Sequence, residues 1–463
     1  MTVRFILDNE IIETDAAATD SVLDLLRYRL RRTGTKEGCA EGDCGACTVL
    51  LGEPAGDTVA WRAVNACILF VPMLDGKALM TVESLGGAHP VQHGMVTRHG
   101  SQCGFCTPGF VMSLVGRSMT AAGTEGVAVG DVIAGNLCRC TGYGPILDAG
   151  EAVPPAARDD SALADRLRAL PRGEGEGWFA PRTSDEFAAL LVAHPDARIV
   201  AGATDVGLWV TKQHRALGTV IFLGDVADLR DVTESDAGLT IGAGARYSDA
   251  REALTRLHPD LGELIRRIAG VQVRNTGTIG GNIANGSPIG DMPPALIALG
   301  ATLTLRKGDT SRTIALEDFF IAYGKQDRVP GEFVESIFVP RPAPSALIRI
   351  VKLSKRFDSD ISAVCGAIAL DIVDNTIAKA RVAFGGMAAT PKRAAACEAA
   401  LTGAPMSEAT FEAAATAIAE DYAPLDDLRG SAQYRLTVAA NLLRRLWAEQ
   451  SGAPVSVLEH VDG

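Results

Sequence analysis

The distribution of cysteines constrains this chain more than any other feature of its sequence. Eight of its ten cysteines fall within the first 140 of 463 residues, and Cys365 and Cys397 stand apart. The N-terminus lacks the pattern of a secretory signal, and no apolar run reaches the roughly 18 residues of a membrane span. We therefore expect a cytoplasmic protein, where clustered thiols serve metal or redox chemistry more often than disulfides. Cys365 and Cys397 are expected to be small buried apolar residues.

The first four cysteines have the spacing of an iron–sulfur site. Cys39-x4-Cys44-x2-Cys47, with Cys67 after nineteen intervening residues, matches the plant-type pattern for a [2Fe–2S] cluster. Three glycines at 38, 42 and 45 alternate with these ligands. Glycine allows the loop to curl around the inorganic core and lets backbone N–H groups approach the sulfurs. The spacing predicts a metal cluster held by this loop.

The second four cysteines form two close pairs, Cys103-x2-Cys106 and Cys138-x-Cys140. Thr107-Pro108 predicts a helix with Thr107 as its N-cap, and a further helix is expected to begin near Pro145. Each pair therefore precedes a helix N-terminus, whose partial positive charge suits an anionic thiolate site. Spacing alone is compatible with either a [2Fe–2S] cluster or tetrahedral zinc.

Composition and pattern describe a globular chain of several domains. The net charge of −12 argues against a nucleic-acid or anionic-membrane partner, because no surplus of cations is present. The N-terminal part predicts a hairpin turning at Asp8-Asn9, a helix capped by Ser21 and a strand at 48–51. Residues 89–155 predict short helices, and residues 158–177 read as a polar, flexible linker.

The remainder of the chain predicts mixed α/β structure. Strands are expected at 197–201, 301–305, 348–351, 366–373 and 381–384, a single helix at 249–268, and an alanine-rich helix pair near the C-terminus. Two glycine-rich loops, 199–206 and 278–282, could bind an anion through successive backbone N–H groups, although for each loop alone a structural turn is the favoured interpretation.

The chain resembles the molybdenum hydroxylase (xanthine oxidase) family over nearly its whole length. The resemblance is carried by the two glycine loops and by three cysteine motifs, at residues 38–47, 102–109 and 135–143. This resemblance implies an α+β multidomain fold. The implied parts are a ferredoxin-like β-grasp [2Fe–2S] domain at 1–84, a four-helix [2Fe–2S] domain at 85–157, the linker at 158–177, a vanillyl-alcohol-oxidase-type FAD-binding α+β domain at 178–345, and a small α+β C-terminal domain at 346–463.

The resemblance also implies the ligands. Two [2Fe–2S] clusters would be held by Cys39, Cys44, Cys47 and Cys67 and by Cys103, Cys106, Cys138 and Cys140. FAD would be held by Ile199, Val200, Ala201, Gly202, Ala203, Thr204, Asp205 and Val206, and by Thr278, Ile279, Gly280, Gly281 and Asn282. Asp291 would bind the FAD sugar or ribityl part, Glu335 the adenine through its main chain, and Lys352 would lie at the flavin.

Two further positions follow from the same resemblance. Ile268 stands where animal relatives have a phenylalanine near the isoalloxazine ring, and Gln102 would face the molybdenum cofactor across a subunit boundary. A molybdopterin domain is missing from the pattern, so the implied partner is a larger molybdopterin-binding subunit, in a heterotetramer of two small and two large subunits.

The implied function is electron transfer without a catalytic side chain acting on the substrate. Hypoxanthine or xanthine would be oxidised on the partner, and electrons would pass through the second quartet, the first quartet and FAD to NAD⁺. A flavin is needed there because iron–sulfur clusters carry single electrons whereas NAD⁺ accepts a hydride. The alternatives are an aldehyde-, nicotinate- or CO-type hydroxylase subunit and, from another class, a zinc-stabilised nucleotide-binding interaction protein.

Overall fold

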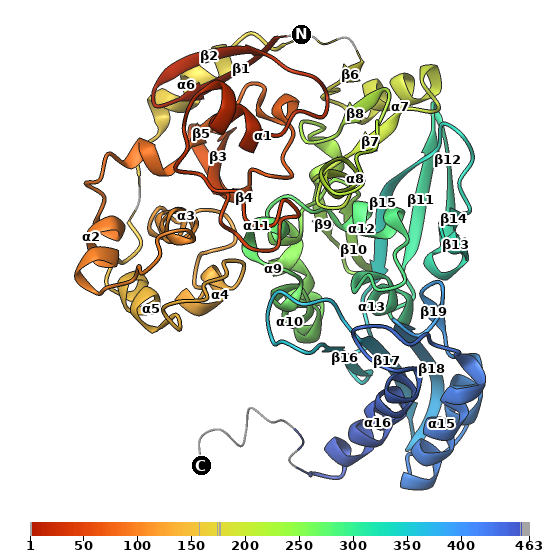
Figure 1. Cartoon of the computed structure of the whole chain (residues 1–463). Helices are drawn as coiled ribbons and strands as arrows, with labels where there is room; N and C mark the ends of the chain where they lie inside the picture. Colours follow the sequence, from red (N-terminus) through yellow and green to blue (C-terminus); the bar gives the residue numbers. More distant parts are fainter. Residues whose placement is uncertain (1, 157, 174, 176, 454, 456–463) are drawn as a thin grey trace. The chain divides into compact units, whose positions relative to one another are not determined.

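The computed structural model describes residues 2–156, 158–173, 175, 177–453 and 455 (Figure 1). The chain forms two compact units, each built from several stretches of sequence. The first unit contains Met1–Arg230, Gly244–Ala250 and Ala269–Thr278, and the second contains Asp231–Ala243, Arg251–Ile268 and Ile279–Gly463.

The first unit begins with a five-stranded mixed sheet of order β2-β1-β5-β3-β4. Its strands are β1 (Thr2–Leu7), β2 (Glu10–Asp15), β3 (Thr48–Ala55), β4 (Thr58–Asn65) and β5 (Ala78–Met80). The predicted hairpin is confirmed, and Asp8 and Asn9 both adopt left-handed backbone angles, with φ of 52° and 63°. β5 pairs in parallel with β1, whereas the other pairs are antiparallel. This strand order agrees with the predicted β-grasp domain.

Ser21 caps the first helix as predicted, by accepting the backbone N–H of Asp24 at 3.0 Å. The helix is short, however: α1 (Val22–Asp24) continues as a π-helical turn, η1 (Leu25–Arg29). Leu23, Leu25 and Leu26 bury this segment in the core with the strands. Two 3₁₀ turns, η2 (Val71–Leu74) and η3 (Val82–Leu85), flank β5.

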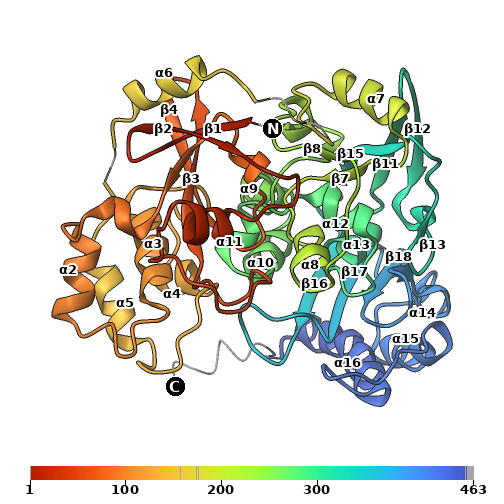
Figure 2. The same cartoon turned by 45° about the horizontal axis from the view of Figure 1, so that its top comes forward.

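Four helices follow the sheet and gather into one group (Figure 2): α2 (Pro90–Thr97), α3 (Thr107–Ser118), α4 (Val129–Ile133) and α5 (Gly144–Glu151). Phe110, Leu114 and Ile146 are among the residues at the core of this group. The N-cap of α3 is Cys106 rather than the predicted Thr107, because Thr107 and Pro108 already lie within the helix. Proline is tolerated there because backbone N–H groups in the first turn of a helix have no acceptor within the helix.

The segment predicted as a flexible linker contains a helix, α6 (Ser161–Ala169). Its sequence is polar overall but amphipathic, and Ala164, Leu167 and Leu170 bury one side against the hydrophobic core. The prediction of flexibility was therefore wrong for 161–169, because spacing of the apolar residues outweighed their small number. Residues 157, 174 and 176 lie outside the described residues, and the predicted limits between domains remain predictions.

The rest of the first unit is a small parallel sheet of order β6-β8-β7 with helices. Its elements are β6 (Trp178–Phe179), α7 (Ser184–Ala193), β7 (Arg198–Val200), α8 (Val206–Thr211), β8 (Val220–Phe222), η4 (Asp228–Arg230) and α11 (Val271–Arg274). The predicted strand at 197–201 is confirmed as β7. The first glycine loop, 199–206, starts within β7 and leads directly into α8.

The second unit contains an antiparallel sheet of order β12-β11-β15-β10-β9. Its strands are β9 (Val232–Glu234), β10 (Gly238–Gly242), β11 (Thr302–Lys307), β12 (Thr310–Ala315) and β15 (Phe333–Pro340), with η5 (Leu316–Phe319) and the hairpin of β13 (Phe320–Ala322) and β14 (Lys325–Gln326) after β12. Three helices of this unit are α10 (Pro259–Arg267), α12 (Ile279–Asn285) and α13 (Met292–Ala298).

The helix predicted over 249–268 is two helices, α9 (Tyr247–Leu257) and α10. Pro259 cannot donate a backbone hydrogen bond within a continuous helix, so the chain ends α9 before it. His258 becomes the N-cap of α10 and accepts the N–H of Asp260 at 3.2 Å.

The second unit ends with an antiparallel sheet of β16 (Leu347–Leu353), β17 (Val364–Val373), β18 (Thr376–Gly385) and β19 (Lys392–Arg393), which confirms the predicted strands. Three helices share a hydrophobic core with it (Figure 2): α14 (Ala395–Leu401), α15 (Glu408–Asp421) and α16 (Ala432–Gln450). The expected alanine-rich pair is present, and α14 precedes it. Cys365 and Cys397 are buried as predicted.

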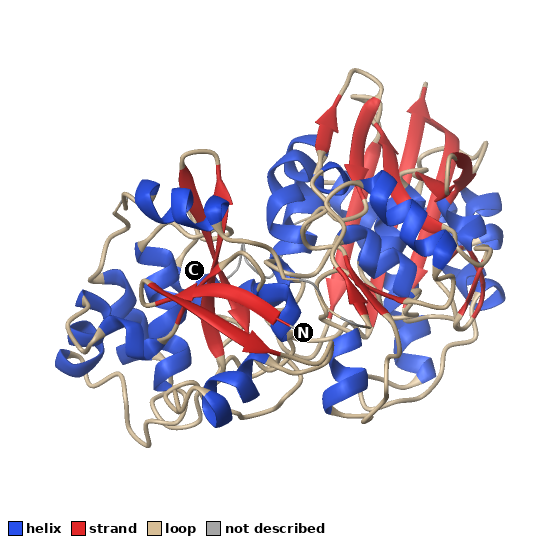
Figure 3. Cartoon of the chain, turned by 90° about the horizontal axis from the view of Figure 1, so that it is seen from above, coloured by secondary structure: helices blue, strands red, loops and turns tan. Residues whose placement is uncertain are grey.

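Both units mix strands with helices (Figure 3), which confirms the α+β class. Within the described ranges, none of the helices is long and apolar enough to cross a membrane. Residues 456–463 of the predicted C-terminal domain lie outside the described residues.

Candidate functional site

The first cysteine quartet lies in the first unit, with Cys47 directly before β3 and Cys67 two residues after β4. Cys47 and Cys67 are buried, whereas Cys39 and Cys44 are half-buried. The thiols of Cys44 and Cys67, with the backbone N–H groups of Glu41 and Cys44, hold the pKa of Cys39 well below that of a free thiol. Contacts with the sulfurs of Cys39 and Cys47, together with burial, raise the pKa of Cys67. The four sulfurs therefore form a continuous series of contacts, from Cys44 through Cys39 and Cys67 to Cys47.

Backbone N–H groups point at this quartet. The N–H groups of Glu41 and Cys44 each donate to the Cys39 sulfur at 3.4 Å. The loop reaches this geometry through left-handed backbone angles at Ala40, Gly42 and Gly45, with φ of 54°, 81° and 68°. Donors of this kind stabilise the negative charge of thiolate ligands.

The second quartet forms from two cross-paired cysteines. Cys103 contacts Cys140, and Cys106, at the N-cap of α3, contacts Cys138. Burial raises the pKa of Cys106 to about 12. Cys103 and Cys140 are exposed, as is Gln102 beside them, so one edge of this quartet faces the surface of the chain.

Cys138 is the best-supported sulfur of the second quartet. It accepts the N–H groups of Cys140 and Thr141 at 3.5 Å each, and the Thr141 hydroxyl lies 3.2 Å away. Burial raises the pKa of the Cys138 thiol, but the Thr141 hydroxyl and these N–H groups lower the pKa by more. The net shift of the Cys138 pKa is therefore downward. The backbone N–H of Cys138 donates to the Tyr143 hydroxyl at 3.0 Å.

The donor sets of both quartets fit a four-thiolate [2Fe–2S] cluster. In each quartet the sulfurs contact one another. They also accept backbone N–H groups from glycine-containing loops, which suits the negative charge of such a cluster.

A polar network joins the loops of the two quartets. The N–H of Leu137 donates to the carbonyl of Cys44 at 2.9 Å, and the side-chain amide of Asn136 donates to the carbonyl of Gly45 at 3.1 Å. The side-chain amide of Gln272, from α11, donates to Asn136 Oδ1 at 3.0 Å. Asn136 and Gln272 are both buried, and neither was predicted as a site residue from the sequence. The signal available for Asn136 was its place directly before the second cysteine pair.

The first glycine loop is tightly packed. A Cβ at Gly202 would lie 1.9 Å from the carbonyl oxygen of Thr276, so this position accepts only glycine. Ala203 adopts a left-handed backbone angle, with φ of 59°. The loop therefore presents a fixed backbone turn, as a pyrophosphate-binding loop requires.

Helix α8 joins this loop to the first quartet. Gly207 lies against Ile68, the residue after Cys67, where an added Cβ would approach the Ile68 Cβ to 2.8 Å. At the other end of the helix the Thr211 hydroxyl donates to the carbonyl of Ala40 at 2.7 Å. The loop at 199–206 is thus one short helix away from Cys39 and Cys67.

The second glycine loop begins at Thr278 in the first unit and continues into the second. There a Cβ at Gly280 would lie 2.4 Å from the Ala243 Cβ, so the chain segments are in close contact. Asn282 Oδ1 is buried and has no hydrogen-bond partner in the described part of the chain. An unsatisfied buried amide is costly, and a bound ligand with a donor group would satisfy it. This atom fits the expected FAD site.

Asp291 and Lys352 come together in the second unit. Lys352 Nζ lies 2.6 Å from Asp291 Oδ2, and the Ser362 hydroxyl donates to Asp291 Oδ1 at 2.5 Å. Both charged side chains are buried, and the carbonyl of Lys352 accepts from Arg267 at 2.7 Å. The pair is therefore fixed in place from both sides.

The other two expected contacts also lie in the second unit. Ile268 is the buried C-cap of α10. The carbonyl of Glu335 accepts the N–H of Ala243 at 3.0 Å, and its carboxylate pairs with Arg306 at 3.1 Å. The main chain of Glu335 is thus held beside the segment that contacts Gly280.

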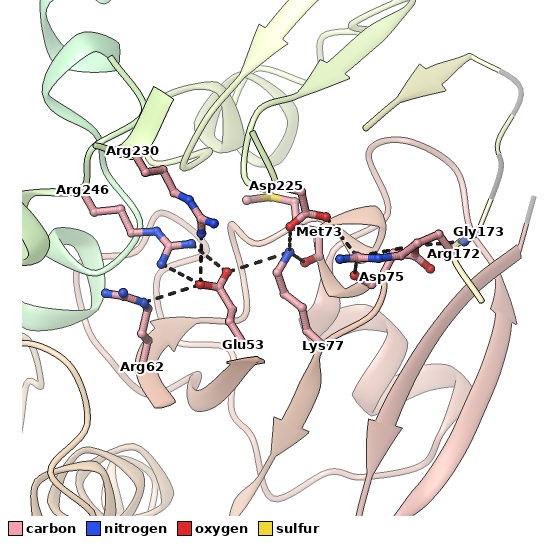
Figure 4. Close-up of polar contacts among 10 residues, drawn as sticks. All are labelled: Glu53, Arg62, Met73, Asp75, Lys77, Arg172, Gly173, Asp225, Arg230 and Arg246. Carbon is pink, nitrogen blue, oxygen red and sulfur yellow. Dashed lines mark hydrogen bonds and ion pairs between the residues drawn. The ribbon is translucent and has the colours of Figure 1, made fainter. Parts of the chain in front are cut away.

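A buried ionic cluster, which we call the Glu53 cluster, lies in the first unit (Figure 4). It comprises Glu53, Arg62, Asp75, Lys77, Arg172, Asp225, Arg230 and Arg246. Arg246 donates to both oxygens of Glu53, at 2.7 and 2.8 Å, and Lys77 lies between Glu53 and Asp225. Gly202 lines the same small cavity as this cluster. This cluster was not predicted from the sequence, where its only signal was a lone glutamate in the apolar strand β3.

Four family models match consecutive parts of the chain. Residues 5–71 match a 2Fe-2S iron-sulfur cluster binding domain and residues 81–151 a [2Fe-2S] binding domain. Residues 172–342 match the FAD binding domain in molybdopterin dehydrogenase, and residues 349–450 the CO dehydrogenase flavoprotein C-terminal domain. Both cysteine quartets lie within iron–sulfur domains, which favours a cluster over zinc at the second quartet.

The chain is similar to parts of several oxidoreductases. Xanthine dehydrogenase from Emericella nidulans is 30% identical over 96% of this chain, which covers 38% of that protein. Carbon monoxide dehydrogenase from Hydrogenophaga pseudoflava has a solved chain with a TM-score of 0.55 and 30% identity, covering 59% of this chain and 96% of its own. Quinoline 2-oxidoreductase from Pseudomonas putida 86 has a TM-score of 0.54 and 25% identity, covering 61% of this chain and 99% of its own. This chain spans little more than a third of the curated relative's length.

Proposed function

The chain belongs to the molybdenum hydroxylase family as an iron–sulfur and FAD subunit, and from this premise we propose that it is the electron-transfer subunit of a xanthine dehydrogenase. Hypoxanthine or xanthine would be oxidised on a larger partner that carries the molybdopterin cofactor. NAD⁺ would be the final acceptor, and the assembly would be a cytoplasmic heterotetramer of two small and two large subunits.

The continuity of contacts from one quartet to the flavin loop carries this proposal. The loop of the second quartet is hydrogen-bonded to the first at Leu137 and Cys44, and α8 connects the first quartet to residues 199–206. The exposed edge at Cys103 and Cys140 leaves the second quartet accessible to a partner. Electrons would therefore enter at the second quartet and leave through the first.

In this proposal the residues of the chain would hold the two clusters and FAD. When bound, the two clusters supply one-electron carriage and FAD combines electrons in pairs for hydride transfer. The backbone N–H groups at Cys39 and Cys138 would stabilise negative charge on the sulfurs. In the same way, the fixed turn at Gly202 would direct backbone N–H groups toward the FAD pyrophosphate.

We also propose FAD contacts for residues of the second unit. Asn282 Oδ1 offers an acceptor, and the buried Asp291–Lys352 pair offers polar groups fixed by Ser362 and Arg267. We assign to FAD the residues of both glycine loops together with Ile268, Asp291, Glu335 and Lys352. No side chain of this subunit need act as an acid or base on the purine.

A second candidate is the equivalent subunit of another hydroxylase, such as a CO- or quinoline-type enzyme. The way the matches cover the chain favours xanthine dehydrogenase. The Emericella nidulans protein aligns with 96% of this chain in one polypeptide, whereas the carbon monoxide dehydrogenase chain covers only 59% of it.

The test is to purify the chain with its natural partner and assay the complex. We expect xanthine-dependent reduction of NAD⁺ by the complex, and NADH-dependent reduction of an artificial dye by this chain alone. The chain alone should be inert toward xanthine. Turnover of quinoline, CO or an aldehyde in place of xanthine would transfer the proposal to the second candidate. Xanthine turnover by the chain alone would overturn the electron-transfer role.

A further inference from the structure

A single hydroxyl connects the flavin-loop helix to the first cysteine loop. The Thr211 hydroxyl, in the last position of α8, donates to the carbonyl of Ala40 at 2.7 Å. The carbonyl of Gly207, one turn earlier in the same helix, lies 3.1 Å away and is the weaker acceptor. A helical threonine ordinarily bonds only to its own helix, so the contact with Ala40 is directed outward.

The accepting carbonyl belongs to a peptide group that also donates to a sulfur. Ala40 and Glu41 share one peptide bond, and the N–H of Glu41 donates to the Cys39 sulfur at 3.4 Å. The contacts form a chain: the Thr211 hydroxyl binds the Ala40 carbonyl, and the N–H at the other end of that peptide binds the sulfur. Hydrogen bonds linked through one peptide polarise each other, so the outer bond strengthens the inner one.

We propose that Thr211 is a positioning residue that sets the reduction potential of the group held by the first quartet; this rests on the proposed electron-transfer function. Hydrogen bonds to ligand sulfurs stabilise the reduced, more negative state and raise the potential. Thr211 acts through the Ala40–Glu41 peptide and touches neither a cysteine nor the flavin loop's backbone turn.

Thr211 lies on the helix that connects the loop 199–206 to the first quartet. Helix α8 starts at the end of the loop 199–206, and Gly207 fixes it against Ile68 beside Cys67. The helix is thus held at both ends by the first quartet's surroundings. The neighbouring ion pair of Lys212 and Glu41 is 3.8 Å long with both side chains 42% exposed, so it contributes little. The Thr211 hydroxyl is therefore the specific link.

The test uses the full chain loaded with iron and FAD, in a redox titration followed by electron paramagnetic resonance. Thr211→Val keeps the shape of the side chain and removes the hydroxyl, whereas Thr211→Ser keeps the hydroxyl. Thr416→Val is the matched control, since the Thr416 hydroxyl bonds only to Glu412 within α15. The signal of the first quartet is the one that Cys44→Ala removes.

We expect Thr211→Val to move the midpoint of that signal to a lower potential. The shift should change the equilibrium constant for electron exchange between the two clusters by about two- to tenfold, which corresponds to the free energy of one hydrogen bond. The second signal should keep its midpoint, and Thr211→Ser and Thr416→Val should match the unmodified chain. Thr211→Ala should give the same shift and replaces Thr211→Val if that variant loses iron.

An unchanged midpoint in Thr211→Val or Thr211→Ala would overturn the proposal, as would equal shifts of both signals or failure of Thr211→Ser to restore the midpoint. These results would leave the proposed function intact. If the unmodified chain instead shows no pair of [2Fe–2S] signals, the electron-transfer function itself fails.

Discussion

The backbone N–H of Leu137 lies 2.9 Å from the carbonyl oxygen of Cys44, so the loops of the two cysteine quartets are hydrogen-bonded to each other. Leu137 is covalently joined to Cys138, and Cys44 is itself in the first quartet. The two quartets are thus separated by one hydrogen bond and a few covalent bonds. They nevertheless use separate sets of ligands, and this separation can be tested.

Single cysteine substitutions should remove one cluster at a time. Cys44→Ala should erase one of two distinct [2Fe–2S] signals in electron paramagnetic resonance, and Cys138→Ala the other, because thiolate ligation holds each cluster. The unmodified chain should contain about four iron atoms, as a pair of [2Fe–2S] clusters requires. A variant that keeps both signals would contradict the ligand assignment.

Asn136 should matter for the stability of the first cysteine loop. Asn136→Leu removes the side-chain donor to the Gly45 carbonyl and the acceptor for Gln272 in a buried position. We expect the free energy of unfolding to fall by about 1–3 kcal/mol. The visible absorption of the cluster should then disappear at a lower denaturant concentration. Asn441→Leu, on an exposed position of α16, is the control and should change the midpoint little. Equal effects of the two variants would argue against the network.

Flavin content should depend on Gly202. In Gly202→Ala the new Cβ would meet the Thr276 carbonyl at 1.9 Å, so the loop must move away from its bound position. We expect a strong loss of FAD, measured after release from the protein, with both cluster signals retained. Gly144→Ala is the matched control, because in the described part of the chain no heavy atom outside its own helix and neighbours lies within 4 Å of the added Cβ. Stoichiometric FAD in Gly202→Ala would exclude this loop from the flavin site.

Glu53 should stabilise the first unit in a pH-dependent way. Burial raises the pKa of Glu53, but Arg246, Lys77 and Arg62 outweigh it and hold the pKa well below the ordinary 4.5. Because the folded pKa lies below the unfolded one, this stabilisation is present above pH 4.5 and disappears as the pH falls from there toward the folded value. Glu53→Gln leaves the buried cations without their counter-charge, which should lower the free energy of unfolding by about 3–5 kcal/mol.

The measurement is the free energy of unfolding of both proteins as a function of pH. The difference between the unmodified chain and Glu53→Gln should be largest near neutral pH and shrink below pH 4.5. Glu13→Gln is the control, since Glu13 pairs with Arg4 with a side chain that is 59% exposed. A difference independent of pH would show that the carboxylate charge is not the source of the effect.

The sequence by itself determined the local chemistry of this protein. The spacing of Cys39, Cys44 and Cys47 and the turn at Asp8-Asn9 act over a few residues, so pattern alone predicts them. The strands at the C-terminal sheet followed from periodicity for the same reason. Two local predictions were wrong. Flexibility at 161–169 failed because the apolar residues of α6 have amphipathic spacing, and the single helix at 249–268 failed because Pro259 interrupts it.

Only the tertiary structure decided which distant residues support these sites. Thr211 meets Ala40 across 171 positions, and Gln272 meets Asn136 across 136. The Glu53 cluster likewise gathers cations from separate segments around one buried carboxylate. Such contacts depend on packing of the whole unit rather than on local propensity, because burial makes each unpaired polar group costly and so selects its partner wherever the fold places one.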